Sequence, residues 1–159
     1  MESMDGSFSY YQKLIQAGDI ARVYKSLIAY MLSLRTYFKI NHQEFIVGSF
    51  YQGAMDFTYF SLSTKELKAK KLKLVIIFNH QEASFEIWLA GQNKKVQSHY
   101  SGLIADREMG AHYRASTHPH SILEWVVLKN PDFNETDTIT NRIEEGVNVF
   151  LKDLNRVIG

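Results

Sequence analysis

The segment that decides the fold is KLKLVIIFNHQEASFEIWLA, residues 71–90. Residues 72–78 form a near-continuous apolar run, which is typical of a strand in the middle of a sheet. Residues 79–82 have the composition of a turn, and apolar residues then alternate with others from 85 to 89. The segment therefore predicts a β-hairpin at the centre of the fold.

Two helices are predicted ahead of this hairpin. Apolar residues recur at helical spacing from Ile20 to Phe38, directly after Asp19, which is well suited to cap a helix N-terminus. A shorter helix is predicted over residues 8–17, and Gly18 can take the left-handed conformation that ends a helix. We expect the two helices to form a helical hairpin.

The remaining elements follow from propensity and spacing, and residues 106–121 are predicted as a long loop. The chain is expected to be a single α+β domain over residues 1–159, with residues 1–6 flexible. Its sheet should have three to four mainly antiparallel strands covered by helices, in the order helix, helix, three strands, helix, strand, helix. The later elements are a strand at 57–61, a helical turn at 64–68, a helix after Gly91, a strand at 122–128 and a helix from about Asp137.

Composition excludes several classes of protein. With 159 residues, of which 45% are apolar and 13% aromatic, the chain can build a core, so global disorder is excluded. The formal net charge of +1 gives no electrostatic argument for a nucleic acid or an anionic membrane as partner. The absence of cysteine excludes a disulfide scaffold, thiolate metal sites and a cysteine nucleophile.

No stretch of the sequence approaches the roughly 18 consecutive apolar residues that cross a bilayer. The first residues also lack the apolar run of a secretory signal. We therefore expect a cytoplasmic protein without a membrane partner.

The candidate site is drawn from two parts of the chain. Gly91, followed by amide side chains and lysines, offers N–H groups and positive charge where a strand meets a helix, which suits an anion or a nucleobase. Trp88 shares a strand face with Glu86 and can serve as a stacking platform. The alternative is structural, with Asn93 capping a helix and a helix packed on Trp88. The predicted ligand-binding residues are Tyr51, Gln52, Asp56, Glu86, Trp88, Gln92, Asn93 and Lys94.

Two acids stand in otherwise apolar and aromatic strands, where an unpaired charge is costly. If Asp56 and Glu86 face each other, they could hold a divalent cation or share a proton, as in metal-assisted hydrolysis. Alternatively, one of them points to solvent or pairs with Lys73.

Other polar clusters give weaker indications. His112, His118 and His120 match no standard zinc spacing, so no metal site and no cofactor is expected. Five lysines within residues 65–73 could form a phosphate-binding edge or protect a sheet edge from aggregation. The motifs of nucleotide hydrolases, dehydrogenases, serine hydrolases and zinc proteases are absent.

Three segments of the chain carry a resemblance to a known family. They are YQGAMDFTYFS at residues 51–61, FEIWLAGQNK at 85–94 and NPDF at 130–133. The chain resembles an uncharacterised family of small bacterial cytosolic proteins over most of residues 10–155. This resemblance implies a stand-alone domain and transfers no activity.

The predicted order of elements is also similar to the core of the PD-(D/E)xK nuclease superfamily. In that superfamily the third strand carries an acid, one residue and a lysine. The corresponding residues here are Glu86-Ile87-Trp88, with Trp in place of the lysine, and no proline precedes Asp56.

Our leading hypothesis is a non-enzymatic binding or interaction module, because a polar and aromatic cluster occurs without a recognisable catalytic set. Its partner would be a small anionic or nucleotide-like ligand, or a protein. One alternative is a divergent metal-dependent nuclease or hydrolase that uses Asp56 and Glu86. Another is a homodimeric structural protein, since the many aromatic residues could form an apolar surface patch.

Overall fold

The structure is built around one antiparallel sheet. In this computed structural model, which describes residues 4–159, the sheet has six strands in the order β1-β2-β3-β4-β6-β5. The elements in chain order are α1 (Asp5–Ala17), α2 (Asp19–Asn41), β1 (Ile46–Tyr51), β2 (Phe57–Ser63), α3 (Lys65–Ala69), β3 (Leu72–Asn79), β4 (Ser84–Gly91), α4 (Lys94–Ala105), β5 (Tyr113–Ala115), β6 (Leu123–Lys129) and α5 (Thr136–Ile158). The predicted α+β class and antiparallel pairing are confirmed.

The central hairpin has the predicted form. β3 and β4 pair without a break from Leu72 opposite Gly91 to Asn79 opposite Ser84. The run in β3 is nearly all apolar because side chains on both faces of this strand are buried. Ile76 is buried in the main core, and Ile77 is buried in the smaller cluster on the opposite face of the sheet.

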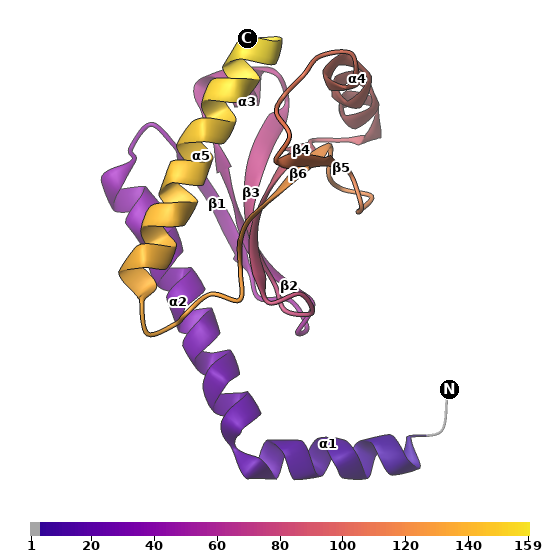
Figure 1. Cartoon of the computed structure of the whole chain (residues 1–159), viewed down its shortest axis with the longest axis vertical. Coiled ribbons are helices and arrows are strands. Elements are labelled where there is room, and N and C mark those ends of the chain that lie inside the picture. Colours follow the sequence, from indigo (N-terminus) through magenta and orange to yellow (C-terminus); the bar gives the residue numbers. More distant parts are fainter. Residues whose placement is uncertain (1–3) are drawn as a thin grey trace.

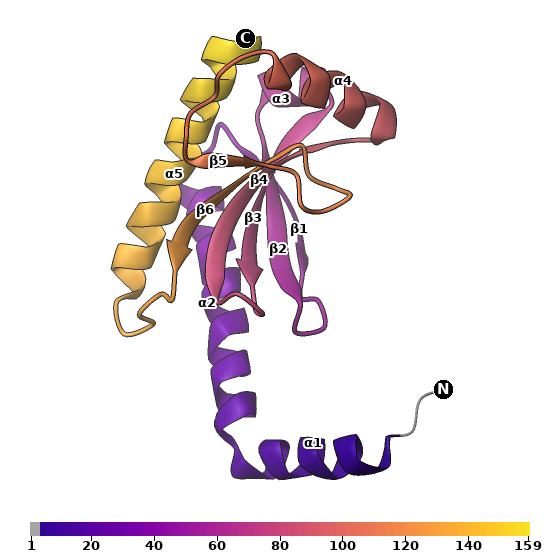
Figure 2. The same ribbon diagram turned by 45° about the vertical axis from the view of Figure 1, so that its right-hand side comes forward.

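Helices α2 and α5 cover one face of the sheet, whereas α4 lies across one end of it (Figures 1 and 2). The segment after α4 contacts α5 through Glu108 and Met109, and the segment between β5 and β6 reaches the other face, where His118 lies near Trp88. α5 approaches the sheet closely at Gly146, where an added Cβ would lie 3.0 Å from Ile87 Cδ1 and 3.4 Å from the methyl groups of Val127. The main core therefore lies between these two helices and the sheet.

The predicted number of three to four strands is wrong because two strands at the sheet edges were missed. β1 contains Gly48 and a register irregularity between Val47 and Phe50, so it lacks a regular alternation of apolar residues. β5 has three residues and lies within the segment predicted as a loop, 106–121. Edge strands bury little, and their apolar pattern is correspondingly weak.

The two N-terminal helices do not form the expected hairpin. α1 extends away from the sheet, and the two helices form an L in both views (Figures 1 and 2). A single residue, Gly18, connects them in the left-handed conformation with φ 87°, whereas an antiparallel helical hairpin needs a connection of about 2–5 residues. Residues 1–3, part of the segment 1–6 that was expected to be flexible, lie outside the described residues, and α1 begins at Asp5.

A charged cluster joins the end of α2 to α5. Glu144 Oε2 lies 2.6 Å from His42 Nε2 and accepts a hydrogen bond of 2.7 Å from the Tyr37 hydroxyl. Burial lowers the pKa of His42, but hydrogen bonds to Glu144 and Glu44 outweigh it and raise the pKa above its ordinary value. The charged imidazole is therefore favoured in the folded state.

We expect the free energy of unfolding to fall as the pH rises from 6.5, the ordinary pKa of the imidazole, through the raised pKa of His42. The folded state holds this proton more tightly than the unfolded chain does, so the stabilisation is complete below pH 6.5 and is lost above the folded-state pKa. Urea unfolding between about pH 6 and about pH 9 measures this dependence. In Glu144→Gln the free energy of unfolding should depend less steeply on pH. An equally steep fall in that variant would contradict the role of the His42–Glu144 pair.

Candidate functional site

The face of the sheet opposite α2 and α5 carries a second, smaller apolar cluster. Val75, Ile77, Trp88 and Ala90 are buried there, and Phe57 and Tyr59 pack against them as half-buried aromatic rings. The strand register explains this grouping, because Val75 lies opposite Trp88, and Ile77 lies opposite both Glu86 and Tyr59. Every second side chain of a strand points to the same face, so these residues of neighbouring strands form one continuous surface.

A cavity of ≈ 500 Å³ lies over this surface. Its floor is the aromatic and apolar cluster, with Lys73 and Gln92 near one end and Asp56 near the other. His118 and His120, from the segment between β5 and β6, form a further wall. The cavity thus combines an apolar floor with charges of opposite sign at its two ends.

Side chains of α4 and β6 hold the histidine segment in place. Glu124 accepts hydrogen bonds from the backbone N–H and the hydroxyl of Thr117, at 2.9 and 2.7 Å. Gln97 of α4 donates to the carbonyl oxygens of Pro119 and Ser121, at 2.6 and 3.0 Å. As a result, the ring centroid of His118 lies 5.2 Å from that of Trp88.

Glu86 is buried, with 1% of its surface exposed, and is held by four donors. Its Oε1 accepts from Trp88 Nε1 at 2.9 Å and from Arg114 Nη2 at 3.0 Å. Its Oε2 accepts from Ser84 Oγ at 2.7 Å and from Asn79 Nδ2 at 3.1 Å. The carboxylate therefore fixes the indole of Trp88 rather than facing a ligand.

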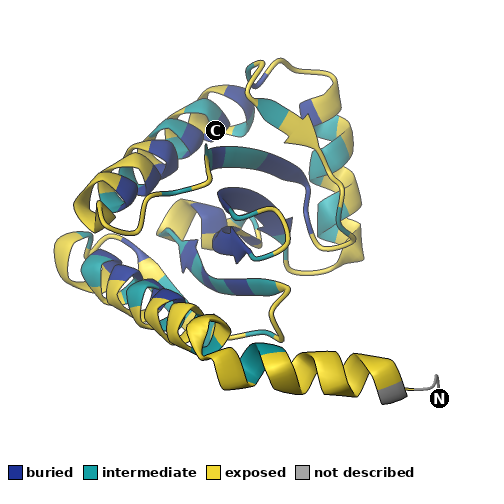
Figure 3. Cartoon of the chain, turned by 60° about the horizontal axis from the view of Figure 1, so that its bottom comes forward, coloured by how far each residue is buried: buried dark blue, intermediate teal, exposed yellow. Residues whose placement is uncertain are grey.

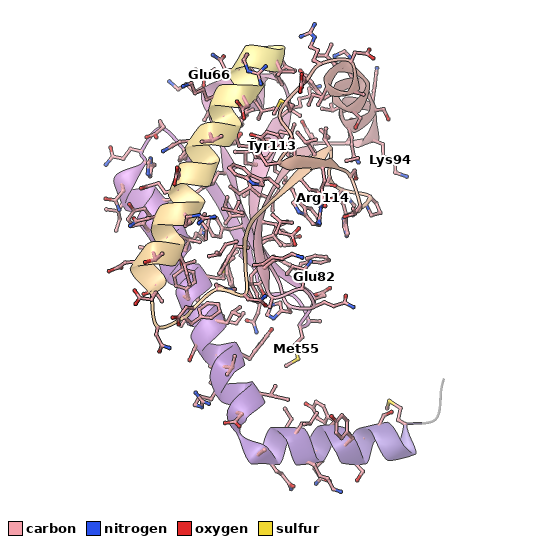
Figure 4. The ribbon with its side chains drawn as sticks, viewed as in Figure 1. Met55, Glu66, Glu82, Lys94, Tyr113 and Arg114 are labelled. Carbon is pink, nitrogen blue, oxygen red and sulfur yellow. The ribbon has the colours of Figure 1, made fainter. Side chains whose placement is uncertain are left out.

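Arg114 connects this carboxylate to a second one. Its Nε donates to Oε1 of Glu124, a fully buried residue, at 3.0 Å. Burial by itself raises the pKa of Glu124, but hydrogen bonds from Ser121, Thr117 and Arg114 lower it overall, which favours the charged form. Figure 4 shows Arg114 on the side of the sheet away from α5. One guanidinium thus bridges carboxylates from β4 and β6.

The structure does not bring Asp56 and Glu86 together. Glu86 lies opposite Ile77, which lies opposite Tyr59, so Asp56 is two strands and three residues away. At ~4.8 Å between strands and ~3.3 Å per residue, their Cα atoms are about 14 Å apart. Hydrogen bonds from the backbone N–H groups of Ala54 and Phe57 lower the pKa of the exposed Asp56. Within residues 4–159, no group of three or more His, Asp or Glu residues could hold a metal ion.

The other predicted site residues divide into two groups. Tyr51, Trp88 and Gln92 line the cavity with Asp56, whereas Gln52, Asn93 and Lys94 are absent from its lining. The Asn93 side chain instead accepts from the Val96 N–H at 2.9 Å and caps α4, and Gln52 Nε2 donates to the Tyr24 hydroxyl at 3.4 Å. Lys94 points away from the sheet (Figure 4).

Sequence reasoning missed several cavity residues. Strand periodicity could have identified Lys73 and Tyr59, because the first lies two residues from Val75 and the second lies two residues from Phe57 on the same face. No sequence signal places His118 beside Trp88 or His120 in the cavity wall, since the position of this segment depends on contacts with Glu124 and Gln97.

His80, which has no partner visible in the sequence, contacts a buried hydroxyl. Its Nε2 lies 2.7 Å from Thr58 Oγ1, which donates its proton to the carbonyl oxygen of Gln52. Since Thr58 has only one proton to donate, Nε2 of His80 is the donor in this pair. Burial lowers the pKa of His80, although Asp56 opposes the shift. The pair is therefore not a nucleophile with its general base.

Replacing Arg114 by Ala should lower the free energy of unfolding by about 3 kcal/mol, because Glu86 and Glu124 would remain buried without their cation. This loss of free energy is at the lower end of the range for breaking a buried ion pair, because the Arg114 side chain is 45% exposed. Urea unfolding measures it.

The matched control is Arg22→Ala, whose 3.1 Å ion pair with Asp19 lies on the surface and should change the stability by less than about 0.5 kcal/mol. Equal losses in the two variants would refute the role of the bridge.

Comparisons with known proteins place the chain in a family. Neither the curated proteins nor the solved structures gave a significant match. Among residues 4–159, no helix combines the length and apolar character required to span a membrane. A family model matches residues 4–158, nearly the whole chain. The chain belongs to that family, which is described as a domain of unknown function (DUF7000).

Proposed function

We propose that this protein is a non-enzymatic binding module whose ligand is a small nucleotide-like anion held in the cavity over Trp88. The observation that carries the proposal is the aromatic floor with Lys73 at one end, on a sheet whose other face is covered by helices. A cavity of ≈ 500 Å³ is within the usual range for small-molecule sites.

The aromatic floor supports binding of a planar ring. Hydrogen bonding to Glu86 fixes the Trp88 indole, and the Phe57 ring meets it at a centroid distance of 5.4 Å in an edge-on arrangement. Tyr59 extends this surface and packs at a tilt against Tyr51, with ring centroids 4.8 Å apart. Rings that are already ordered bind a flat ligand with little further loss of side-chain entropy.

The charges at the two ends support a defined orientation of the ligand. Lys73 is exposed and opposite Ala90, and within residues 4–159 it makes no ion pair, so its ammonium group is free to bind an anion. At the far end, the Asp56 carboxylate can accept a hydrogen bond from an amino group. A nucleotide would place its phosphate near Lys73 and its base over Trp88.

A thermal-shift series with AMP, adenosine and inorganic phosphate tests this proposal, because a ligand that binds the native state raises the apparent stability. AMP should raise the melting temperature more than adenosine or phosphate, since it engages both the floor and the cation. If nucleoside phosphates, including ATP and GTP, leave the melting temperature unchanged, the proposal is refuted.

Lys73→Gln should weaken AMP binding about tenfold, the effect of losing one hydrogen bond between charged groups. Isothermal titration calorimetry measures this change. Lys94→Gln removes a lysine that was predicted to bind but lies outside the cavity lining, and it should leave the affinity unchanged. Equal losses in both variants would point to nonspecific attraction of the anion.

Tyr59→Leu should weaken AMP binding about tenfold while preserving the fold, because it removes an aromatic ring from a half-buried position. Trp88→Ala is a poorer test, since it also removes a donor to the buried Glu86. The same calorimetric titration, with circular dichroism as the folding control, gives the result. Unchanged affinity in a folded Tyr59→Leu protein would remove the stacking role.

A further inference from the structure

Helix α1 presents an apolar stripe to solvent. Met4, Phe8, Tyr11 and Ile15 recur at the spacing of one helical face, and Phe8 and Tyr11 are 60% and 58% exposed. From Gly6 to Ala17 no residue of α1 is buried, whereas α2 and α5 each carry a row of buried residues (Figure 3). The stripe thus has the pattern of a packing surface.

A helix of this length needs a surface to pack on. α1 has 13 residues, and isolated helices shorter than about 12–15 residues are marginal in water. Its position away from the sheet removes the packing that stabilises α2 (Figure 1). Neither apolar cluster within residues 4–159 includes a residue of α1, so a stable α1 requires apolar packing from outside the single chain.

An apolar groove lies on the same chain, close to the corner between α1 and α2. Its cavity of ≈ 380 Å³ is lined by Ile20, Val23, Tyr24 and Leu27 of α2 and by Met55 from the turn before β2. Val23 and Met55 are 51% and 50% exposed. Figure 4 shows Met55 at the end of the sheet that faces α1. The α2 residues also have one-face helical spacing, which is suited to receive a helix.

The α1 helix of the same copy does not fill this groove. The groove lining begins at Asp19, directly after Gly18, and the one-residue connection is too short for α1 to fold back antiparallel on α2. A second copy has the same stripe and the same groove, and a twofold axis satisfies both pairs at once. The exposed stripe and the exposed groove are thus complementary between two copies.

The area is sufficient for a specific interface. With large side chains of roughly 150–250 Å², the exposed parts of the stripe and the groove amount to about 600 Å² per copy. Two copies would bury about 1,200 Å², the lower limit for a stable protein interface. The net charge of +1 produces little repulsion between the copies.

We propose that two copies of this chain form a twofold dimer by exchanging α1, with the Phe8–Tyr11–Ile15 stripe of each copy in the Val23–Met55 groove of the other. The contact is an exchange of one terminal helix, so each copy is at once donor and acceptor. This dimer is independent of the ligand-binding role of the cavity, which lies at a different set of residues.

Sedimentation equilibrium of the full chain tests the dimer. At up to about 100 μM, a concentration that populates even weak interfaces, the wild type should have twice the 18.4 kDa mass of one chain. A monomer throughout this range overturns the proposal.

Two variants then locate the interface. Phe8→Asp with Tyr11→Asp disables the stripe, and Val23→Asp disables the groove; each protein should be monomeric while circular dichroism shows a folded sheet. The control is Ile40→Asp, at an apolar residue 66% exposed and outside the groove, and it should stay dimeric. A dimer that persists in either disabled variant overturns the assignment.

Mixing the two disabled variants separates exchange from any other interface. The groove variant keeps an intact stripe and the stripe variant keeps an intact groove, so a mixture restores one of the two contacts. A weak heterodimer should form in the mixture and in neither protein alone. Absence of the heterodimer would show that the two surfaces do not meet.

Discussion

The open side of the sheet depends on the bridge from Arg114 to two buried carboxylates. Glu86 and Glu124 are 1% and 0% exposed, and burying two negative charges side by side is tolerable only because one guanidinium and several neutral donors satisfy them. The bridge also joins three strands, since Arg114 belongs to β5, Glu124 to β6 and Glu86 to β4. The short strand β5 is held at the sheet edge by this charge pairing together with Tyr113, whose ring packs against Trp125 and Phe150.

The same hydrogen-bond network positions the residues that line the cavity. Glu86 orients the Trp88 indole, and Glu124 anchors the segment that carries His118. Neither carboxylate is in the cavity lining, yet the floor and one wall are positioned by them. Polar groups buried within the sheet therefore act as positioning residues for a surface that is mostly aromatic, and this explains why two acids occur in strands that otherwise favour apolar side chains.

Sequence reasoning succeeded where burial imposes a simple pattern. The hairpin of β3 and β4 is mostly apolar because side chains on both of its faces are buried, and α2 shows one apolar stripe because one side of it packs on the sheet. Sequence reasoning failed where an element depends on a few polar contacts, or where the length of a connection decides how two helices pack. β1 is interrupted at Gly48, and β5 is held by Arg114. For the cavity, residue type was enough to single out Trp88, which lines it. The possibility that Asp56 and Glu86 face each other is wrong, because the register separates them by two strands.

Because α1 and α2 meet at Gly18 alone, a small rotation at this residue moves the far end of α1 by several ångströms. A helix of 13 residues is about 20 Å long, so a rotation of about 10° at the corner displaces its far end by about 3 Å. Two backbone dihedral angles of one glycine set the direction of the whole arm, and glycine allows those angles a wide range. The direction of α1 can therefore follow the surface against which it packs, without any change in the sheet or in the cavity over Trp88.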